Sequence, residues 1–448
     1  MKRVIPLIAF LLVSYFSFAQ YENIDLSKYK LPDIKRHQLD FTFNTDGTGG
    51  NSLSYFGEDD SESREFKSTD FMGEGKLGYS FYRNSPSFQI AASANTNLNY
   101  AKSKNEMDGT TDEENKNFNS SLSGSYDVKY FMGRKQWFLT SVSNLSMSHN
   151  KDKDFVEDLN YTGKSFSGRM ALGGGIGRIE QVQDYRHAIL LLQELEKRGV
   201  DKRMLTEDEV LAFSAVLSDL KNKRFFDARN RKQAELEAIH AFLLENGVVD
   251  EKMNMNYFVG LEDVWVFGAL QTRESGKQLK LTGTPRYFIN TNTGSNESKL
   301  EYWEVASALT YQVSNPISLK WQSDYNFGFI NRYMDKITEK NISFGASKHY
   351  SHLYASAGIA FYPNTRTRLN LSGLLYFQNS SDEEFFDNEA YSSSFRLQAS
   401  AYYYISERLR LDGGAFYHSN LNGIFNSDIE NSKYNYWSYS LTLNYAIF

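Results

Sequence analysis

Ionised side chains recur at alternate positions along this chain, inside rows of otherwise uncharged polar residues. Charged side chains on the water-facing side of a sheet can act through their electrostatic field, because rings of charge that line a pore set the preference of the pore for ions and solutes. Pairing of these charges with one another across the sheet is an equally supported interpretation, since both signs are present. The candidate lumen-lining residues are Asp127, Lys129, Arg169, Lys280, Arg286, Glu304, Lys320, Asp324, Arg396, Arg408, Arg410 and Asp412.

Patterns for catalysis or metal binding are missing from the sequence. The seven histidines, including His149, His352 and His418, have no metal-ligand spacing. The absence of cysteine excludes disulfides, thiolate nucleophiles and cysteine zinc sites. The run from Gly173 to Gly177 lacks the Lys and the Ser or Thr of a phosphate loop, so we interpret it as a crowded point or a bend in a strand. We therefore predict no enzyme, no cofactor and no metal site.

The elements that position the charges are long strands with one apolar and one polar face. Successive strand side chains point to opposite faces, and the polar row from Gln89 to Asn99 interleaves with an apolar row from Phe88 to Tyr100. The terminal segment repeats the pattern from Trp437 to Ile447. A charged residue on a lipid-facing row costs about 2 to 4 kcal/mol at the bilayer midplane, so a charge-free row is typical of a membrane-facing surface. Runs this long also argue against a soluble sandwich, whose strands average about 5 to 6 residues.

Alternation and turn residues predict fourteen strands, an even number that places both ends of the sheet on the same side. Tight turns such as Asn84-Ser85-Pro86 and Pro363-Asn364 alternate with long acidic loops such as 106–114 and 382–389. Short turns belong in the periplasm and long loops outside the cell. We predict strands at 36–56, 66–83, 87–102, 116–132, 136–150, 162–180, 277–291, 298–313, 316–330, 342–362, 365–379, 391–405, 407–421 and 433–448.

Composition and the leader place the chain in the cell envelope. Lys2 and Arg3 precede an apolar stretch and a small-residue site, which predicts a signal peptide over residues 1–20. Mean hydropathy is −0.53, which excludes a helical membrane protein. A net charge of −6 argues against nucleic acid as a partner.

These features resemble the Gram-negative outer-membrane β-barrel proteins, on the leader, the alternating segments and the terminal aromatic Phe448. The resemblance implies an all-β, antiparallel up-and-down transmembrane barrel in the outer membrane, surrounded by lipid. It also implies that barrel-insertion machinery reads the C-terminal strand, although Phe448 is one position out of step with the apolar row through Tyr445 and Ile447.

Residues 181–275 interrupt the strands with an α-helical pattern, and we expect them to lie in the periplasm between barrel strands 36–180 and 276–448. A short N-terminal segment, 21–35, precedes the first strand. Helices are predicted at 185–197, after the capping box Thr206 to Glu209, and at 224–245, with Gly199 and Gly247 as stops. Residues 257–267 are an ambiguous fourth element.

Two functions remain open from the sequence. The first is a channel or passive transporter for small solutes, with a polar lumen gated by the outer loops or by the insertion. The second is a barrel that anchors the helical insertion for a periplasmic protein or the cell wall. An insertion that only caps or plugs the barrel, without a partner, is a further alternative.

Overall fold

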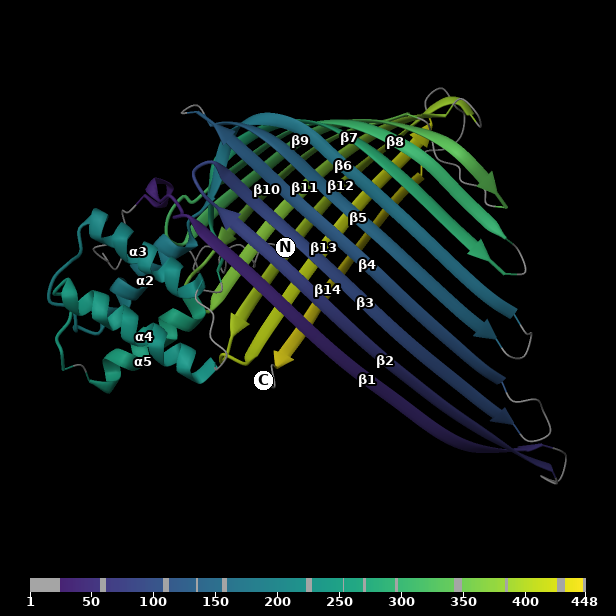
Figure 1. The fold of residues 1–448 in the computed structure, drawn as a ribbon, viewed down its shortest axis with the longest axis horizontal. Coiled ribbons are helices and arrows are strands. Elements are labelled where there is room, and N and C mark those ends of the chain that lie inside the picture. Colours follow the sequence, from purple (N-terminus) through teal and green to yellow (C-terminus); the bar gives the residue numbers. More distant parts are fainter. Residues whose placement is uncertain are drawn as a thin grey trace, which may run out of the picture.

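The computed structural model describes residues 25–445, apart from 57–61, 108–112, 134–135, 155–158, 223–227, 253, 269–270, 295–296, 342–348, 383–385 and 425–431. The predicted leader, Phe448 and most of the acidic loops lie outside these residues. One fourteen-stranded sheet dominates the structure, with its strands in sequence order (Figure 1). The strands are β1 (Ile34–Phe56), β2 (Glu62–Asn84), β3 (Phe88–Met107), β4 (Glu113–Met132), β5 (Trp137–Asp154), β6 (Leu159–Gln181), β7 (Glu274–Thr293), β8 (Ser298–Asn315), β9 (Trp321–Lys340), β10 (His349–Phe361), β11 (Thr367–Asp382), β12 (Phe386–Tyr404), β13 (Leu409–Ile424) and β14 (Ser432–Tyr445).

Each strand pairs antiparallel with its neighbours in sequence, so the predicted up-and-down topology is confirmed. The register keeps apolar side chains on one face, since Leu98 on β3 lies on the same face as Leu77 on β2 and Leu122 on β4. Large apolar side chains on this face remain exposed from β1 to β14. An exposed apolar surface of this extent is the surface that a bilayer covers.

The first strand and the last strand are the edges of the sheet. Among the described residues, no ladder joins β1 to β14, whereas the prediction was a closed cylinder. Outer-row side chains are correspondingly open on both edges, with Phe41 73% exposed and Leu441 73% exposed.

β9 begins later than predicted. β9 starts at Trp321 instead of residue 316, and it extends to Lys340. Residues 316–320 form the turn between β8 and β9, where Ser318 caps the turn by accepting from the backbone N–H groups of Lys320 and Trp321. Leu319 therefore lies buried beneath the helical insertion and not on the outer apolar row.

Four helices lie between β6 and β7, namely α2 (Gln183–Lys197), α3 (Glu207–Asn222), α4 (Ala228–Glu245) and α5 (Met255–Gly268). The predicted capping box forms, because the Thr206 N–H donates to Glu209 at 2.8 Å and the Glu209 N–H donates to the Thr206 hydroxyl at 3.4 Å. Gly199 and Gly247 both have positive φ at the predicted stops. The ambiguous element is the helix α5, whose apolar residues lie on more than one side.

Residues 182–273 form one helical module with a hydrophobic core of its own. Leu192, Phe213, Leu243 and Leu261 contribute one residue from each helix, and all four are buried. The N-terminal segment joins this core through Leu26, which belongs to the short 3₁₀ helix η1 (Leu26–Lys28), and through the residues that follow it. Figure 1 shows the module at the same end of the sheet as the tight turns.

The glycine run on β6 marks a close approach of two strands, as predicted. A Cβ atom at Gly173 would lie 2.0 Å from the Leu281 carbonyl oxygen, and one at Gly175 would lie 2.2 Å from that of Leu279. Gly177 and Gly276 adopt φ of +97° and +129°, which side chains strongly disfavour. The β6 and β7 backbones that lead into the module are therefore packed more closely than side chains at these glycines would allow.

Candidate lumen and its helical floor

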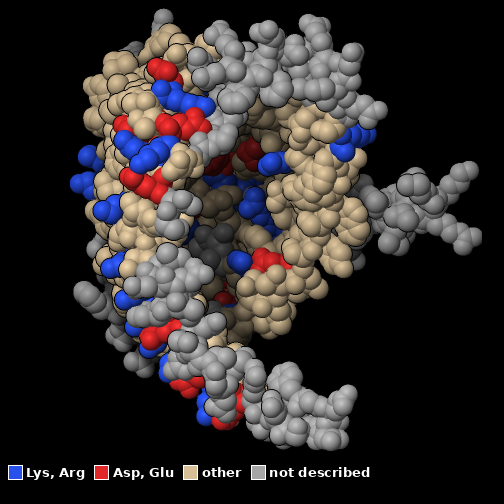
Figure 2. All heavy atoms as spheres, turned by 90° about the vertical axis from the view of Figure 1, so that its right-hand side faces the viewer, with Lys and Arg blue, Asp and Glu red and all other residues tan. Residues whose placement is uncertain are grey.

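The strand register brings most of the predicted charged residues to the face opposite the apolar row. On β4 to β9 these residues are Asp127, Lys129, Arg169, Lys280, Arg286, Glu304 and Asp324, and on β12 and β13 they are Arg396, Arg410 and Asp412. Lys320 and Arg408 lie instead in the exposed turns β8–β9 and β12–β13, outside the strands. Figure 2 looks into the hollow from the end away from the module and shows charged side chains of both signs inside it.

A cluster of arginines shares one carboxylate near the middle of this inner face. Glu304 is almost fully buried and lies 3.6 Å from Arg286 and 3.3 Å from Arg332. Arg169 is the direct cross-strand partner of Arg286. Sequence reasoning missed Arg332, because the predicted strand ended at residue 330 while β9 continues through it.

Other charged side chains of the inner face have partners on the same strand or on the next one. Arg410 lies 2.8 Å from Asp412, two residues along the same strand. Arg396 lies 3.3 Å from the His418 ring on the neighbouring strand. The inner face therefore combines satisfied pairs with the arginine-rich cluster around Glu304.

A cavity of about 1150 Å³ joins the inner face of the sheet to the module. Its wall includes Ser93 on β3, Asp127 on β4 and Arg169 on β6. Its other side includes Lys221 and Asn222 at the end of α3, and Arg231 on α4. The module therefore covers this end of the candidate lumen.

Lys221 holds its position through a buried ion pair. Its ammonium lies 2.6 Å from Asp184, a fully buried residue of α2. Arg36 on β1 approaches the same carboxylate at 3.6 Å and donates to the Asn222 side chain at 2.6 Å. Burial lowers the pKa of Lys221, whereas the Asp184 carboxylate raises it. These contacts tie α2 and α3 to the first strand of the sheet.

On the opposite side of the module, two buried arginines bind the β8–β9 turn. Arg273 donates to the carbonyl oxygens of Ser318, Leu319 and Trp321 at 2.7 to 2.9 Å. Arg186 donates to the Leu319 carbonyl at 2.8 Å, and both guanidinium groups lie over the Tyr362 ring. Burial and the neighbouring Arg273 lower the pKa of Arg186 to about 9, so it remains cationic at neutral pH.

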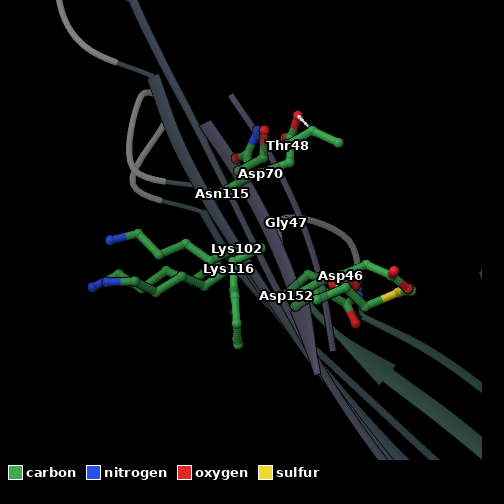
Figure 3. Close-up of a pocket in the computed structure, with 14 residues that line it drawn as sticks. Asp46, Gly47, Thr48, Asp70, Lys102, Asn115, Lys116 and Asp152 are labelled. Atoms are coloured by element: carbon green, nitrogen blue, oxygen red, sulfur yellow. Dashed lines mark hydrogen bonds between the residues drawn. The ribbon is translucent and has the colours of Figure 1, made fainter. Parts of the chain in front are cut away.

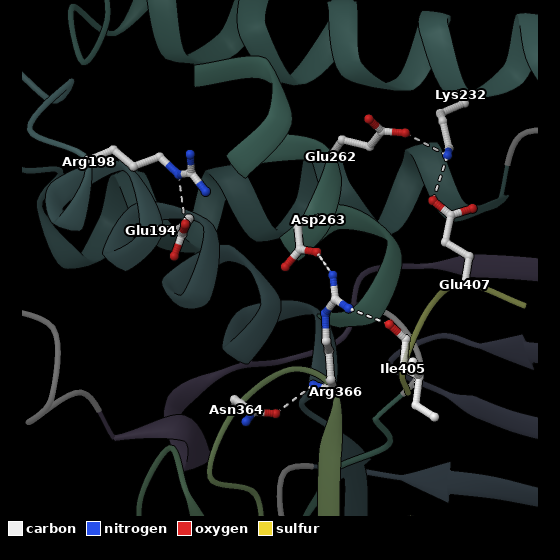
Figure 4. Close-up of polar contacts among 9 residues, drawn as sticks. All are labelled: Glu194, Arg198, Lys232, Glu262, Asp263, Asn364, Arg366, Ile405 and Glu407. Carbon is white, nitrogen blue, oxygen red and sulfur yellow. Dashed lines mark hydrogen bonds and ion pairs between the residues drawn. The ribbon is translucent and has the colours of Figure 1, made fainter. Parts of the chain in front are cut away.

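The turns β10–β11 and β12–β13 hold α4 and α5 (Figure 4). Arg366 forms an ion pair with Asp263, stacks on Phe267 at 4.1 Å and donates to the Ile405 carbonyl at 3.1 Å. Lys232 bridges Glu262 on α5 at 2.7 Å and Glu407 in the turn at 2.9 Å. Sequence periodicity does not reveal these contacts, because they join residues far apart in the chain.

The end of β6 that leads into the module is hydrogen-bonded to the β2–β3 turn, which lies across the sheet. Arg178 donates to the carbonyl oxygens of Ser85 and Pro86 and to the Asn84 side chain, at 2.8 to 3.0 Å. Its guanidinium also stacks on the Phe131 ring at 4.5 Å. β6 and β2 are not neighbours in the sheet, so these contacts draw the ribbon toward the opposite turn.

A second cavity, of about 520 Å³, lies near the other ends of β1 to β5. Lys102 and Lys116 point together away from Thr48, Asp70 and Asn115 (Figure 3). Both lysines already pair with Glu114 at 2.8 Å. The two lysines of this cavity are therefore paired with one carboxylate.

Within the described residues, no cluster of three or more metal-ligating side chains occurs, and none of the helices is both long and apolar enough to cross a bilayer. No family model matches the chain, and no curated protein matches it. Its architecture has a counterpart in the outer-membrane barrels, which share an up-and-down antiparallel sheet with an apolar outer face and a polar inner face.

Solved structures that match this chain have very low sequence identity to it. The translocator domain of the autotransporter NalP from Neisseria meningitidis is 9% identical, with a TM-score of 0.27, over 83% of this chain and 88% of that one. The Pseudomonas putida toluene transporter TodX is 9% identical, with a TM-score of 0.27, over 89% of each chain. Pseudomonas aeruginosa OprD is 6% identical, with a TM-score of 0.25, over 94% of this chain and 98% of that one. The barrel assignment rests on the strand order and the two faces of this chain.

Proposed function

We propose that this outer-membrane β-barrel is a channel for small solutes whose inner mouth is closed by the helical module. The observation that carries the proposal is the cavity of about 1150 Å³, which is lined by lumen residues on one side and by α3 and α4 on the other. Its lining includes the ionisable side chains of Arg36, Asp127 and Arg169, so water and small polar solutes fit its chemistry. Passage toward the periplasm then requires the module to move or a gap to open beside it.

The contacts that hold the module to the sheet are consistent with a gate. These contacts include polar side chains at the turns, such as Arg273, which binds the β8–β9 turn, and Arg366 of the β10–β11 turn, which forms an ion pair with Asp263 on α5. Directional hydrogen bonds to turn carbonyls can exchange with water when they open, at a net cost of about 1 to 3 kcal/mol each. The positive φ angles of Gly177 and Gly276 mark a place where the β6–β7 ribbon can change direction.

Deletion of the module tests the proposal, and the structure indicates where to cut. Gln181 and Glu274 are direct cross-strand partners, and the Val182 N–H donates to the Arg273 carbonyl at 2.9 Å. An Asn-Gly turn in place of 182–273 therefore closes a two-residue hairpin. We expect the deleted protein to show a several-fold larger single-channel conductance in planar bilayers than the full chain.

A matched variant separates gating from damage to the barrel. Arg273→Ala keeps the whole module but removes three of the four hydrogen bonds that Arg186 and Arg273 donate to the carbonyl oxygens of Ser318, Leu319 and Trp321. We expect frequent openings to the level of the deleted protein, whereas Arg396→Ala on the inner face leaves the module closed. If the deleted protein folds, as judged by β-sheet circular dichroism, and conducts no more than the full chain, the channel proposal is wrong.

A second candidate function is supported by an apolar patch on α5. Met255, Phe258 and Val259 lie at one end of this helix and are 77%, 36% and 52% exposed. Their spacing of three and four residues puts them on one helix face. A docking module for a periplasmic partner predicts that Val259→Glu abolishes co-purification of that partner and leaves conductance unchanged, which is the opposite of the result expected for a gate variant.

A further inference from the structure

A row of polar side chains crosses the inner face of the sheet and ends at two adjacent arginines. The register aligns Ser93 on β3, Ser125 on β4, Asn144 on β5, Arg169 on β6 and Arg286 on β7. All of these residues line a cavity of about 410 Å³. Within its described lining there is no carboxylate, so every group that faces this space is neutral or cationic.

The two arginines are not equivalent in their pairing. Arg286 lies 3.6 Å from Glu304 and donates to the Ser167 hydroxyl at 3.3 Å. Glu304 also forms an ion pair with Arg332. Among the described residues, the Arg169 side chain has no ion pair and no hydrogen bond, although Arg169 stands directly opposite Arg286. Like charges directly opposite each other on a sheet are destabilising unless an anion lies between them.

Arg169 also lies at the junction of two cavities. Together with Ser93, Ser125 and Asn144 it lines both the cavity of the polar row and the larger cavity above the module. A solute that moves along the lumen toward the module would pass its guanidinium. The hydroxyl and amide groups of the row can donate hydrogen bonds to the remaining oxygens of an anion.

We propose that Arg169 and Arg286 form an oxyanion-binding site in the lumen, which takes small solutes that carry a carboxylate or a phosphate. Guanidinium groups bind both kinds of oxyanion through paired N–H donors. Binding at this site does not depend on conduction, whereas an anion preference of the current rests on the proposed channel function. The two consequences are therefore measured separately.

Binding is measured first, by calorimetry on the full chain in detergent, with inorganic phosphate and malonate as probes. Arg169→Gln is expected to weaken binding of both probes at least tenfold, and Arg169→Lys is expected to restore part of it. Arg396→Gln is the matched control, because it removes the same charge elsewhere on the inner face. Equal binding by the wild type and Arg169→Gln overturns the proposal, as does equal loss in both Gln variants.

Ion selectivity is measured second, from the reversal potential across a planar bilayer with a potassium chloride gradient. The wild type is expected to prefer chloride, and Arg169→Gln is expected to lose at least half of that permeability ratio. Binding that depends on Arg169 in a protein without conductance supports the site and contradicts the channel. A chloride preference that Arg396→Gln lowers and Arg169→Gln does not contradicts the site while the channel stands.

Discussion

At the scale of single residues, the two buried arginines of the module, Arg186 and Arg273, are held by neutral oxygens. Arg273 is almost fully buried, and its four hydrogen bonds go to three backbone carbonyls and the Gln322 side chain. A buried charge needs such bonds, because its desolvation costs several kcal/mol. Arg273 thereby fastens the module to one particular turn, since a substitute without the five-donor guanidinium cannot satisfy all four acceptors.

His187 in α2 makes the stability of the module sensitive to acid. It is 1% exposed, its Nε2 lies 2.9 Å from the Val264 carbonyl, and its ring stacks on Trp265. Burial lowers the pKa of His187 well below its ordinary value, and the nearby Lys221 and Arg186 lower it further. The unfolded state therefore binds a proton near pH 6.5 while the folded state does not.

Stability of the module is therefore expected to be complete above about pH 6.5 and to fall by about 1.4 kcal/mol for each pH unit below it. Hydrogen exchange of α2 and α5 peptides between pH 7 and pH 5, corrected for the intrinsic exchange rate, measures this loss. His187→Gln is expected to lower stability at pH 7 and to flatten the pH dependence. His240→Gln is the control, because His240 is only half-buried, and it should retain the slope. An equal slope in wild type and His187→Gln contradicts the assignment.

At the scale of elements, the close approach of β6 and β7 next to the module depends on glycines, which have no side chains. A Cβ atom at Gly175 would lie 2.2 Å from the Leu279 carbonyl oxygen and 2.4 Å from the Phe138 ring. Gly175→Ala must push the two strands apart, at an expected cost of about 1 to 3 kcal/mol. Gly283→Ala on β7 meets nothing within 4 Å and is the matched control. Urea unfolding in lipid vesicles, followed by tryptophan fluorescence, should show a lower midpoint for Gly175→Ala alone.

Most strands and their two faces follow from the sequence, because lipid on one side and water on the other impose a strict period of two. The caps at Thr206 and Gly199 are equally local, so they too are visible in the residues. The late start of β9 is not visible in the residues, because Leu319 departs from the alternating pattern of the sheet and packs under the module. The contacts of Arg178, Arg186 and Arg273 escape prediction for the same reason, since each joins segments that only the folded chain brings together.

At the scale of the whole molecule, the seam between β1 and β14 governs whether the lumen is a sealed space. Each unpaired backbone N–H or C=O group in hydrocarbon costs several kcal/mol, so a bilayer strongly favours pairing of the two edges. An even number of strands makes these edges antiparallel. Both present open apolar rows, with Leu39, Phe41 and Phe43 on β1 and Tyr439, Leu441 and Leu443 on β14.

We therefore expect β1 and β14 to pair when the chain is in a membrane, and the absence of native cysteine makes cross-linking a direct measurement. Phe41→Cys is combined in turn with a cysteine at 437, 439, 441 or 443, and an oxidant is applied in outer-membrane vesicles. One combination should form a disulfide efficiently, because cross-strand neighbours place their Cβ atoms within about 5.5 Å. Tyr417→Cys with Trp437→Cys is the positive control, since these residues are direct partners on β13 and β14. Cross-linking in the control and in none of the seam combinations would show that the edges stay apart, and the lumen would then open sideways to lipid.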